Sequence, residues 1–123
     1  MAEEIDIMID CTLRNGNVEN DFQPATVSVD QTNGKFSDRI LVIGTSVETI
    51  TFGDLTSVGY VMLHNTDSTN YVTIGPQESD GSMEPMIKIN AGEIACLRLD
   101  PSATIKAQAN TADVKLRVDA YDN

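Results

Sequence analysis

Apolar and polar residues alternate in short segments along most of this chain, and this alternation constrains the fold more than any other feature. In the clearest segment, residues 114–120, the even-numbered residues are Val, Leu, Val and Ala, and the odd-numbered ones are Lys, Arg and Asp. Successive side chains of a β-strand point to opposite faces of its sheet, so this pattern predicts a strand with one buried face. Almost no segment has the 3.6-residue period of a helix. The sequence therefore predicts an all-β protein.

Turn-forming residues separate these segments. Asn15-Gly16 and Asn33-Gly34 are typical of tight turns, and Gly75-Pro76 ends another alternating segment. Many short strands between such turns are typical of an antiparallel sandwich or barrel. We expect about nine or ten strands, arranged as an antiparallel, jelly-roll-like β-sandwich.

Three further segments are expected to contribute strands. Residues 58–75 contain two alternating runs around the polar residues 65–70, whose side chains can bond to their own backbone in turns. This arrangement predicts a buried central hairpin. The apolar run 39–43 predicts a strand covered on both faces, and the alternating residues 47–52 predict a further strand.

The length of 123 residues suits one domain with a hydrophobic core. We expect a single β-sandwich domain over residues 1–123, in which residues 1–37 are extended or rich in loops. Residues 1–13 alternate as a half-buried strand with an acidic outer face. An alternative role for this segment is a docking strand that pairs with the edge of a neighbouring subunit.

The charge distribution limits the classes of partner. The net charge is −11, and residues 1–87 account for all of it with 14 acidic and 3 basic side chains. Affinity for phosphate comes mainly from Lys and Arg, so we expect no nucleic-acid partner. No apolar run approaches the roughly 20 residues that cross a bilayer, and the acidic N-terminus is unlike a secretory signal. We therefore expect no membrane partner and synthesis in a cytoplasm.

The two cysteines, Cys11 and Cys96, lie far apart and have no metal-ligand spacing. A chain without an export signal is a poor candidate for a disulfide. Unpaired cysteine behaves as a small hydrophobic residue, which predicts two buried free thiols.

Residues that could carry chemistry are sparse. His64 is the only histidine, and no serine lies in a G-x-S-x-G context with a second histidine to serve as base. The loop around Asp67 offers one carboxylate, whereas calcium needs several that converge. Glu78, Asp80 and Glu84 could gather in the next loop as a weaker candidate. We expect no enzymatic activity, no cofactor and no metal site.

Several segments resemble small virion structural proteins of tailed bacteriophages. They are LVIGT at 41–45, TFGDL at 51–55, Gly59-Tyr60, NTDSTNYVTIG at 65–75, INAGE at 89–93 and AQANTADVKL at 107–116. The similarity extends over about residues 38–121 and consists of turns and strand patterns. The resemblance implies a β-sandwich subunit that is built into a particle in many copies.

The acidic composition favours an outward-facing position in such a particle, because an acidic surface fits poorly against packaged DNA. The sequence hypothesis is a capsid decoration (cement) protein that binds the outer capsid surface and stabilises neighbouring capsid subunits. Its expected partners are the major capsid protein and further copies of itself. A trimer is the leading expectation, because capsid lattices offer three-fold sites.

Two alternatives stay open, a neck, tail or fibre-base structural protein and a carbohydrate-binding module. A sugar site usually needs aromatic platforms, and the chain has no Trp, which leaves Tyr60 and Tyr71 as candidates. The residues expected at an oligomer or capsid interface are apolar or aromatic residues from the N-terminal strand, the central segment and the alanine row: Ile5, Ile7, Ile9, Tyr60, Tyr71, Ala107 and Ala109.

Overall fold

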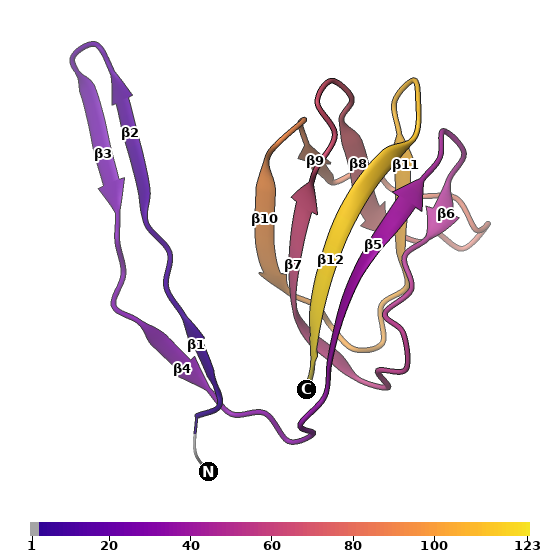
Figure 1. Cartoon of the computed structure of the whole chain (residues 1–123), viewed down its shortest axis with the longest axis horizontal. Helices are drawn as coiled ribbons and strands as arrows, with labels where there is room; N and C mark the ends of the chain where they lie inside the picture. Colours follow the sequence, from indigo (N-terminus) through magenta and orange to yellow (C-terminus); the bar gives the residue numbers. More distant parts are fainter. Residues whose placement is uncertain (1–2) are drawn as a thin grey trace. The chain divides into compact units, whose positions relative to one another are not determined.

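The computed structural model describes residues 3–123, which form twelve β-strands and no helix (Figure 1). Every strand pairing is antiparallel. The prediction of an antiparallel all-β protein is therefore confirmed. The expected count of about nine or ten strands is not confirmed, because the structure contains twelve, four of which are short strands within residues 3–32.

The chain divides into two compact units between Thr32 and Asn33. The sequence predicted one domain over residues 1–123 with an extended or loop-rich stretch at 1–37, and the division falls close to the end of that stretch. The single domain over residues 1–123 stays a prediction.

The first unit is a two-stranded structure that we call the N-terminal ribbon. β1 (Ile5–Ile7) pairs with β4 (Val27–Val29), and β2 (Cys11–Asn15) pairs with β3 (Val18–Phe22). Gly16 lies in the turn between β2 and β3 with a φ of +58°, a conformation that glycine adopts readily. The tight turn predicted at Asn15-Gly16 is confirmed.

The second unit, here called the two-sheet unit, contains two four-stranded sheets. Its strands are β5 (Phe36–Ile43), β6 (Glu48–Thr49), β7 (Val58–Asn65), β8 (Val72–Pro76), β9 (Ile87–Ile89), β10 (Ile94–Arg98), β11 (Ile105–Ala109) and β12 (Val114–Asp122). One sheet has the order β10-β7-β12-β5 and the other β6-β11-β8-β9. The pairing is nested: β5 pairs with β12, β6 with β11, β7 with β10 and β8 with β9.

The hydrophobic core of this unit consists of side chains from both sheets. The inward residues of β12 were predicted from their parity, and all four are buried, as expected. The core is completed by residues from the other strands and one loop, chiefly Ile43, Ile50, Val61, Leu63, Val72, Ile74, Ile89, Ala107 and Ala109. Burying apolar area at roughly 25 cal/mol per Å² is what holds the two sheets together.

The predicted central hairpin over residues 58–75 is wrong. β7 lies in one sheet between β10 and β12, and β8 lies in the other between β9 and β11. The polar residues 66–71 therefore connect the two sheets and do not form a hairpin turn. The polar residues were correctly predicted to form a turn. β7 and β8 both present apolar faces to the same core, and the local sequence does not determine whether they pair with each other.

Asn65 explains how the chain crosses between the sheets. Its side chain is fully buried at the end of β7. Its amide Nδ2 donates to the carbonyls of Asn70, at 2.9 Å, and of Ile89 in the opposite sheet, at 3.0 Å. Its Oδ1 accepts a hydrogen bond from the N–H of Asp67 at 2.9 Å. One buried amide thus links β7, the crossing loop and β9.

Asp67 organises the rest of this crossing loop, and its pKa gives a testable pH dependence. Its Oδ2 accepts hydrogen bonds from the N–H of Asn70 at 2.6 Å and of Thr69 at 3.0 Å, and these bonds lower the pKa of the carboxyl. A carboxyl with a lowered folded-state pKa stabilises the fold above its unfolded pKa of about 3.9, and this contribution is lost as the pH falls through the folded value.

We therefore expect Asp67→Asn to lower the melting temperature near neutral pH. The difference from the wild type should shrink as the pH falls from about 6 toward about 2.5. Thermal unfolding followed by circular dichroism over this range measures the effect. A difference that does not change with pH would show that the charge of Asp67 is irrelevant.

Candidate interaction surfaces

The outward side chains of the β10-β7-β12-β5 sheet form a surface that we call the outer face. Strand register places Ile40, Arg117, His64 and Ile94 in one row across the sheet, and Asp38, Asp119, Met62 and Cys96 in the next. Figure 1 shows these four strands side by side. The outer face comprises Phe36, Asp38, Ile40, Val42, Tyr60, Met62, His64, Ile94, Cys96, Arg98, Lys115, Arg117 and Asp119.

The outer face carries large apolar side chains that water reaches. Phe36 is 69% exposed, Ile40 63% and Ile94 77%. The outward positions of the other sheet are polar by contrast: Thr49, Thr73, Lys88, Lys106 and Gln108. Phe36, Ile40 and Val42 form an exposed apolar group along the edge strand β5, and such groups mark interaction sites more often than scattered residues do, whereas Ile94 lies on the opposite edge strand β10. The two sheets therefore differ in what they can bind.

The sequence pattern does not predict this apolar surface. The run 39–43 predicts a strand covered on both faces, whereas β5 is an edge strand with one face open to solvent. Only the inward residues, such as Ile43, are buried, and Ile40 and Val42 are exposed. Continuous apolar runs are typical of strands buried on both faces, so the missing signal was the edge position, which comes from the pairing of β5 with β12.

Arg117 lies between two carboxylates on the outer face. Its Nε is 3.4 Å from Oδ1 of Asp38, and its Nη2 is 3.1 Å from Oδ2 of Asp119. A hydrogen bond with Asp119 lowers the pKa of Asp38, and Arg117 adds to this effect. Burial raises the pKa of Asp119, and the neighbouring Asp38 adds to that rise. Exposed ion pairs of this kind stabilise little, so their main effect here is to fix the orientation of the three side chains.

A shallow hollow of about 210 Å³ lies on the outer face beside this cluster. Its lining includes Met62, His64, Ile94, Cys96, Arg117 and Asp119. Partial burial raises the pKa of the Cys96 thiol, so the thiol is protonated at neutral pH and is a weak nucleophile. The hollow is suited to receiving an apolar side chain more than to covalent chemistry.

The N-terminal ribbon is amphipathic in both of its halves. In β2–β3 the pairs Cys11–Phe22 and Leu13–Asn20 alternate with the polar pairs of the other face. In β1–β4 one face carries Ile5 opposite Val29 and Ile7 opposite Val27, and the other carries Asp6 opposite Ser28. Ser28 Oγ donates to Asp6 Oδ1 at 2.6 Å. We refer to both sets of apolar residues together, Ile5, Ile7, Cys11, Leu13, Val18, Phe22, Val27 and Val29, as the apolar face of the ribbon.

This apolar face is not covered by the rest of the ribbon. No side chain described in residues 3–32 is fully buried, and Phe22 is 55% exposed. Both cysteines are free and exposed, Cys11 on the ribbon and Cys96 on the outer face. The prediction of buried thiols is therefore wrong, because Cys11 lies in a segment without a core and Cys96 points outward from β10.

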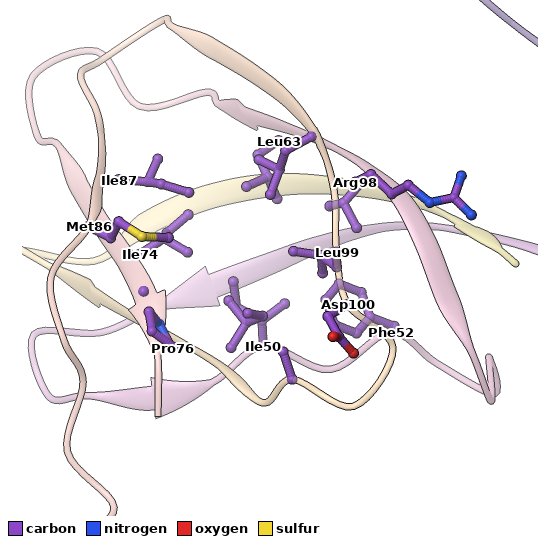
Figure 2. A pocket seen from close by; sticks show the side chains of 15 residues that line it. Ile50, Phe52, Leu63, Ile74, Pro76, Met86, Ile87, Arg98, Leu99 and Asp100 are labelled. Atoms are coloured by element: carbon purple, nitrogen blue, oxygen red, sulfur yellow. The ribbon is translucent and has the colours of Figure 1, made fainter. Parts of the chain in front are cut away.

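An apolar cavity of about 220 Å³ opens inside the two-sheet unit (Figure 2). Ile50, Leu63, Ile74 and Ile87 are among its lining residues. Figure 2 shows the guanidinium of Arg98 extending away from the other labelled side chains. The cavity therefore has an apolar lining with little polar chemistry directed into it.

The seven residues predicted for an interface fall into three environments. Ile5 and Ile7 are half-buried and Ile9 is exposed on the ribbon. Tyr60 and Tyr71 are half-buried, and a cation lies over each ring: Arg98 at 5.1 Å from the first and Lys88 at 4.2 Å from the second. Ala107 and Ala109 are buried in the core, so these two residues are not accessible to another chain. Their small size serves the contact between the two sheets.

The loop 78–84 brings its carboxylates close together, because Ser82 Oγ lies 2.8 Å from Glu78 Oε2 and 2.6 Å from Asp80 Oδ1. Within residues 3–123, no group of three or more His, Cys, Asp or Glu side chains could hold a metal ion. A hydrogen bond and repulsion from Glu78 raise the pKa of Glu84, whereas Asp80 accepts hydrogen bonds from Ser82 at 2.6 and 3.0 Å. None of the described residues forms a helix that is long and apolar enough to span a bilayer.

The chain matches no known protein-family model, and no curated protein matches it significantly.

Proposed function

We propose that this chain is a virion structural protein that acts as a capsid decoration protein of a tailed bacteriophage. In this proposal the protein binds the outer capsid surface as a homo-oligomer, with a trimer as the leading form, and stabilises neighbouring major capsid subunits. It catalyses no reaction and needs no cofactor. The exposed apolar surface on both units is the observation that carries the proposal.

The strand pairing supports a jelly-roll-like β-sandwich as the fold behind this role. The first strand of the two-sheet unit pairs with the last, the second with the next to last, and so on inward to β8 and β9. A long hairpin rolled into two packed sheets has this nested pairing, and jelly rolls are used in viral capsids and in lectins. The fold alone does not distinguish a capsid role from a lectin role, so the choice depends on the surface residues.

The surfaces favour assembly over sugar binding. Phe36, Ile40 and Ile94 expose apolar area of the kind that proteins bury against other proteins. The rings of Tyr60 and Tyr71 each already contact a cation, which leaves less free aromatic surface for a sugar. A decoration protein would use the apolar area to join capsid subunits across their junctions, with each interface on the order of 1,000 Å² or more. Several such contacts in one oligomer would add avidity.

The proposal predicts that the purified protein binds the expanded capsids of the phage that encodes it and raises their melting temperature. Binding to the assembled state alone stabilises that state, by about 2.7 kcal/mol per site at a free concentration of 100 times Kd. Cosedimentation measures binding, and differential scanning calorimetry measures the shift. Absence of binding at saturating concentration would remove the proposal.

Ile40→Asp is the surface variant in this experiment, and Lys88→Asp, on the outward side of the β6-β11-β8-β9 sheet, is its control. Copy number in purified virions separates a decoration protein, with copies over the whole shell, from a neck or tail component at one vertex. Saturable binding to a glycan array that Tyr60→Ala abolishes would instead favour the carbohydrate-binding alternative.

A further inference from the structure

We propose that the apolar cavity inside the two-sheet unit is a binding site for a small, uncharged, apolar molecule. The cavity has a volume of about 220 Å³. This inference goes beyond the capsid role and does not depend on it. The proposed capsid contact uses outward residues such as Phe36, Ile40 and Ile94, and none of these three lines the cavity.

The cavity lies between the two sheets, because strands of both sheets contribute to its lining. Leu63 of β7 and Leu97 of β10 come from one sheet, and Ile74 of β8, Ile87 of β9 and Ile105 of β11 come from the other. Ile74 and Ile87 lie directly opposite each other in the pairing of β8 with β9. Figure 2 shows the side chains of Leu63, Ile74 and Ile87 around a common space. The cavity is therefore continuous with the hydrophobic core.

The lining of the cavity extends from the core to the solvent. Leu63 and Ile74 are buried, whereas Leu97 and Leu99 are only half-buried although they pack against the core. Met86, which also lines the cavity, is 69% exposed. A small molecule can therefore reach the cavity without unfolding of the two-sheet unit.

The polar groups near the cavity indicate that its ligand is uncharged. Only Arg98 and Asp100 are charged among the 15 lining residues, and each has a partner elsewhere. The Nη2 of Arg98 donates to Oδ1 of Asn123 at 2.7 Å, and its guanidinium lies over the ring of Tyr60. The Oδ1 of Asp100 accepts hydrogen bonds from the N–H and the Oγ of Ser102 at 2.9 and 2.7 Å. A charged ligand would lose its water without gaining a partner, which opposes its binding.

The size of the cavity and its lack of hydrogen-bonding side chains favour a hydrocarbon over water. An apolar cavity of about 150 Å³ lined by Leu, Ile and Phe stays dry and binds benzene, so about 220 Å³ has room for roughly nine carbon atoms. Water needs two to four polar partners. Among the described residues, one buried side-chain N or O atom has no hydrogen-bond partner, Asn110 Oδ1, and Asn110 does not line the cavity. An apolar ligand would supply the dispersion contacts that the lining atoms otherwise lack.

The experiment titrates the full chain with toluene and follows its methyl groups by NMR. The methyl signals of Leu63, Ile74 and Ile87 should shift saturably, with half-saturation at about 1 mM or below, a modest affinity for a ligand of this size. Ile43 and Val114 are buried in the same core but do not line the cavity, so their signals should stay in place. Benzoate, which carries a carboxylate on the same ring, should bind at least about tenfold more weakly.

Ala103→Phe tests the position of the site. Ala103 lines the cavity and is exposed, so a larger side chain is tolerated there and fills part of the space. Toluene binding should weaken by roughly tenfold or more, because a filled cavity has no room for the ligand. Ala112→Phe is the matched control, since Ala112 is exposed and lies outside the lining. This control should bind toluene as the wild type does.

Four outcomes would overturn the proposal. The first is the absence of saturable shifts up to the solubility limit of toluene. The second is benzoate binding as tight as toluene binding, which would show that the ligand class is wrong. The third is an equal effect of Ala103→Phe and Ala112→Phe. The fourth is toluene binding only in Met86→Ala, which would show that the side chain of Met86 fills the cavity in the wild type. None of these outcomes affects cosedimentation with capsids, so failure of this proposal is distinguishable from failure of the capsid role.

Discussion

Gly75→Ala is expected to lower the melting temperature of the two-sheet unit by roughly 10 to 20 °C. A Cβ at this position would lie far inside van der Waals contact with the carbonyl oxygen of Glu84 and 2.9 Å from its carbonyl carbon. Overpacking in a well-packed region costs about 1–3 kcal/mol, and more where the obstacle is backbone. For a domain of this size, each kcal/mol shifts the melting temperature by about 4–8 °C.

The backbone opposite Gly75 cannot move aside easily. The N–H of Glu84 donates to the carbonyl of Pro76 at 3.0 Å, and the N–H of Met86 donates to that of Ile74 at 3.1 Å. These bonds hold the strand segment before β9 against β8 on both sides of Gly75. Relief of the clash requires breaking at least one of them, and the freed groups would lose partners that they need when buried.

Gly34→Ala is the matched control for this variant. No heavy atom lies within 4 Å of a Cβ built on Gly34, so the same chemical change meets open space. The control should keep the wild-type melting temperature within a few degrees. Equal melting temperatures for the two variants, followed by circular dichroism, would show that the close approach at Gly75 does not constrain the fold.

The parts of the fold that depend on local pattern could be predicted, and the parts that depend on strand partners could not. Alternation in residues 114–120 gave the correct buried face of β12, and Asn15-Gly16 gave a correct turn. The same reasoning joined β7 and β8 into a hairpin, because adjacent strands separated by a turn usually pair. Their assignment to opposite sheets depends on β9 to β12, which come later in the chain and occupy the pairing edges.

The interaction surfaces show the same division. The exposure of Ile40 and Ile94 depends on which strands lie at the edges of the sheet and on which face of the sheet is covered. A segment of five residues reveals neither of these two facts. Ala107 and Ala109 were expected at an interface for the opposite reason: small residues indicate close packing but do not say against what. Ile5 and Ile7 were correctly placed on one face of a strand.

Asn65→Asp is expected to destabilise the two-sheet unit by about 3 kcal/mol or more near neutral pH. The change keeps the size of the side chain but replaces the donating amide with a carboxylate. The new oxygen would face the carbonyls of Asn70 and Ile89, which now accept hydrogen bonds at 2.9 and 3.0 Å. A buried charge without a partner costs about 3–5 kcal/mol in comparable cases, and lost hydrogen bonds add to this. Asn90→Asp, in an exposed turn, adds the same charge and should change stability by about 0.5 kcal/mol or less.

The pH dependence of this variant identifies the cause. Burial and the two carbonyl dipoles disfavour the charged form, so the folded-state pKa of the new carboxyl lies above its unfolded value of about 3.9. A raised folded-state pKa means that the destabilisation is full at high pH and is relieved as the pH falls through the folded value, because a protonated carboxyl can donate to one of the two carbonyls. The stability difference between Asn65→Asp and the wild type, measured by urea unfolding, should therefore shrink from pH 7 toward about pH 4. A difference that is constant with pH would mean that the lost amide geometry, and not the buried charge, is the dominant cost.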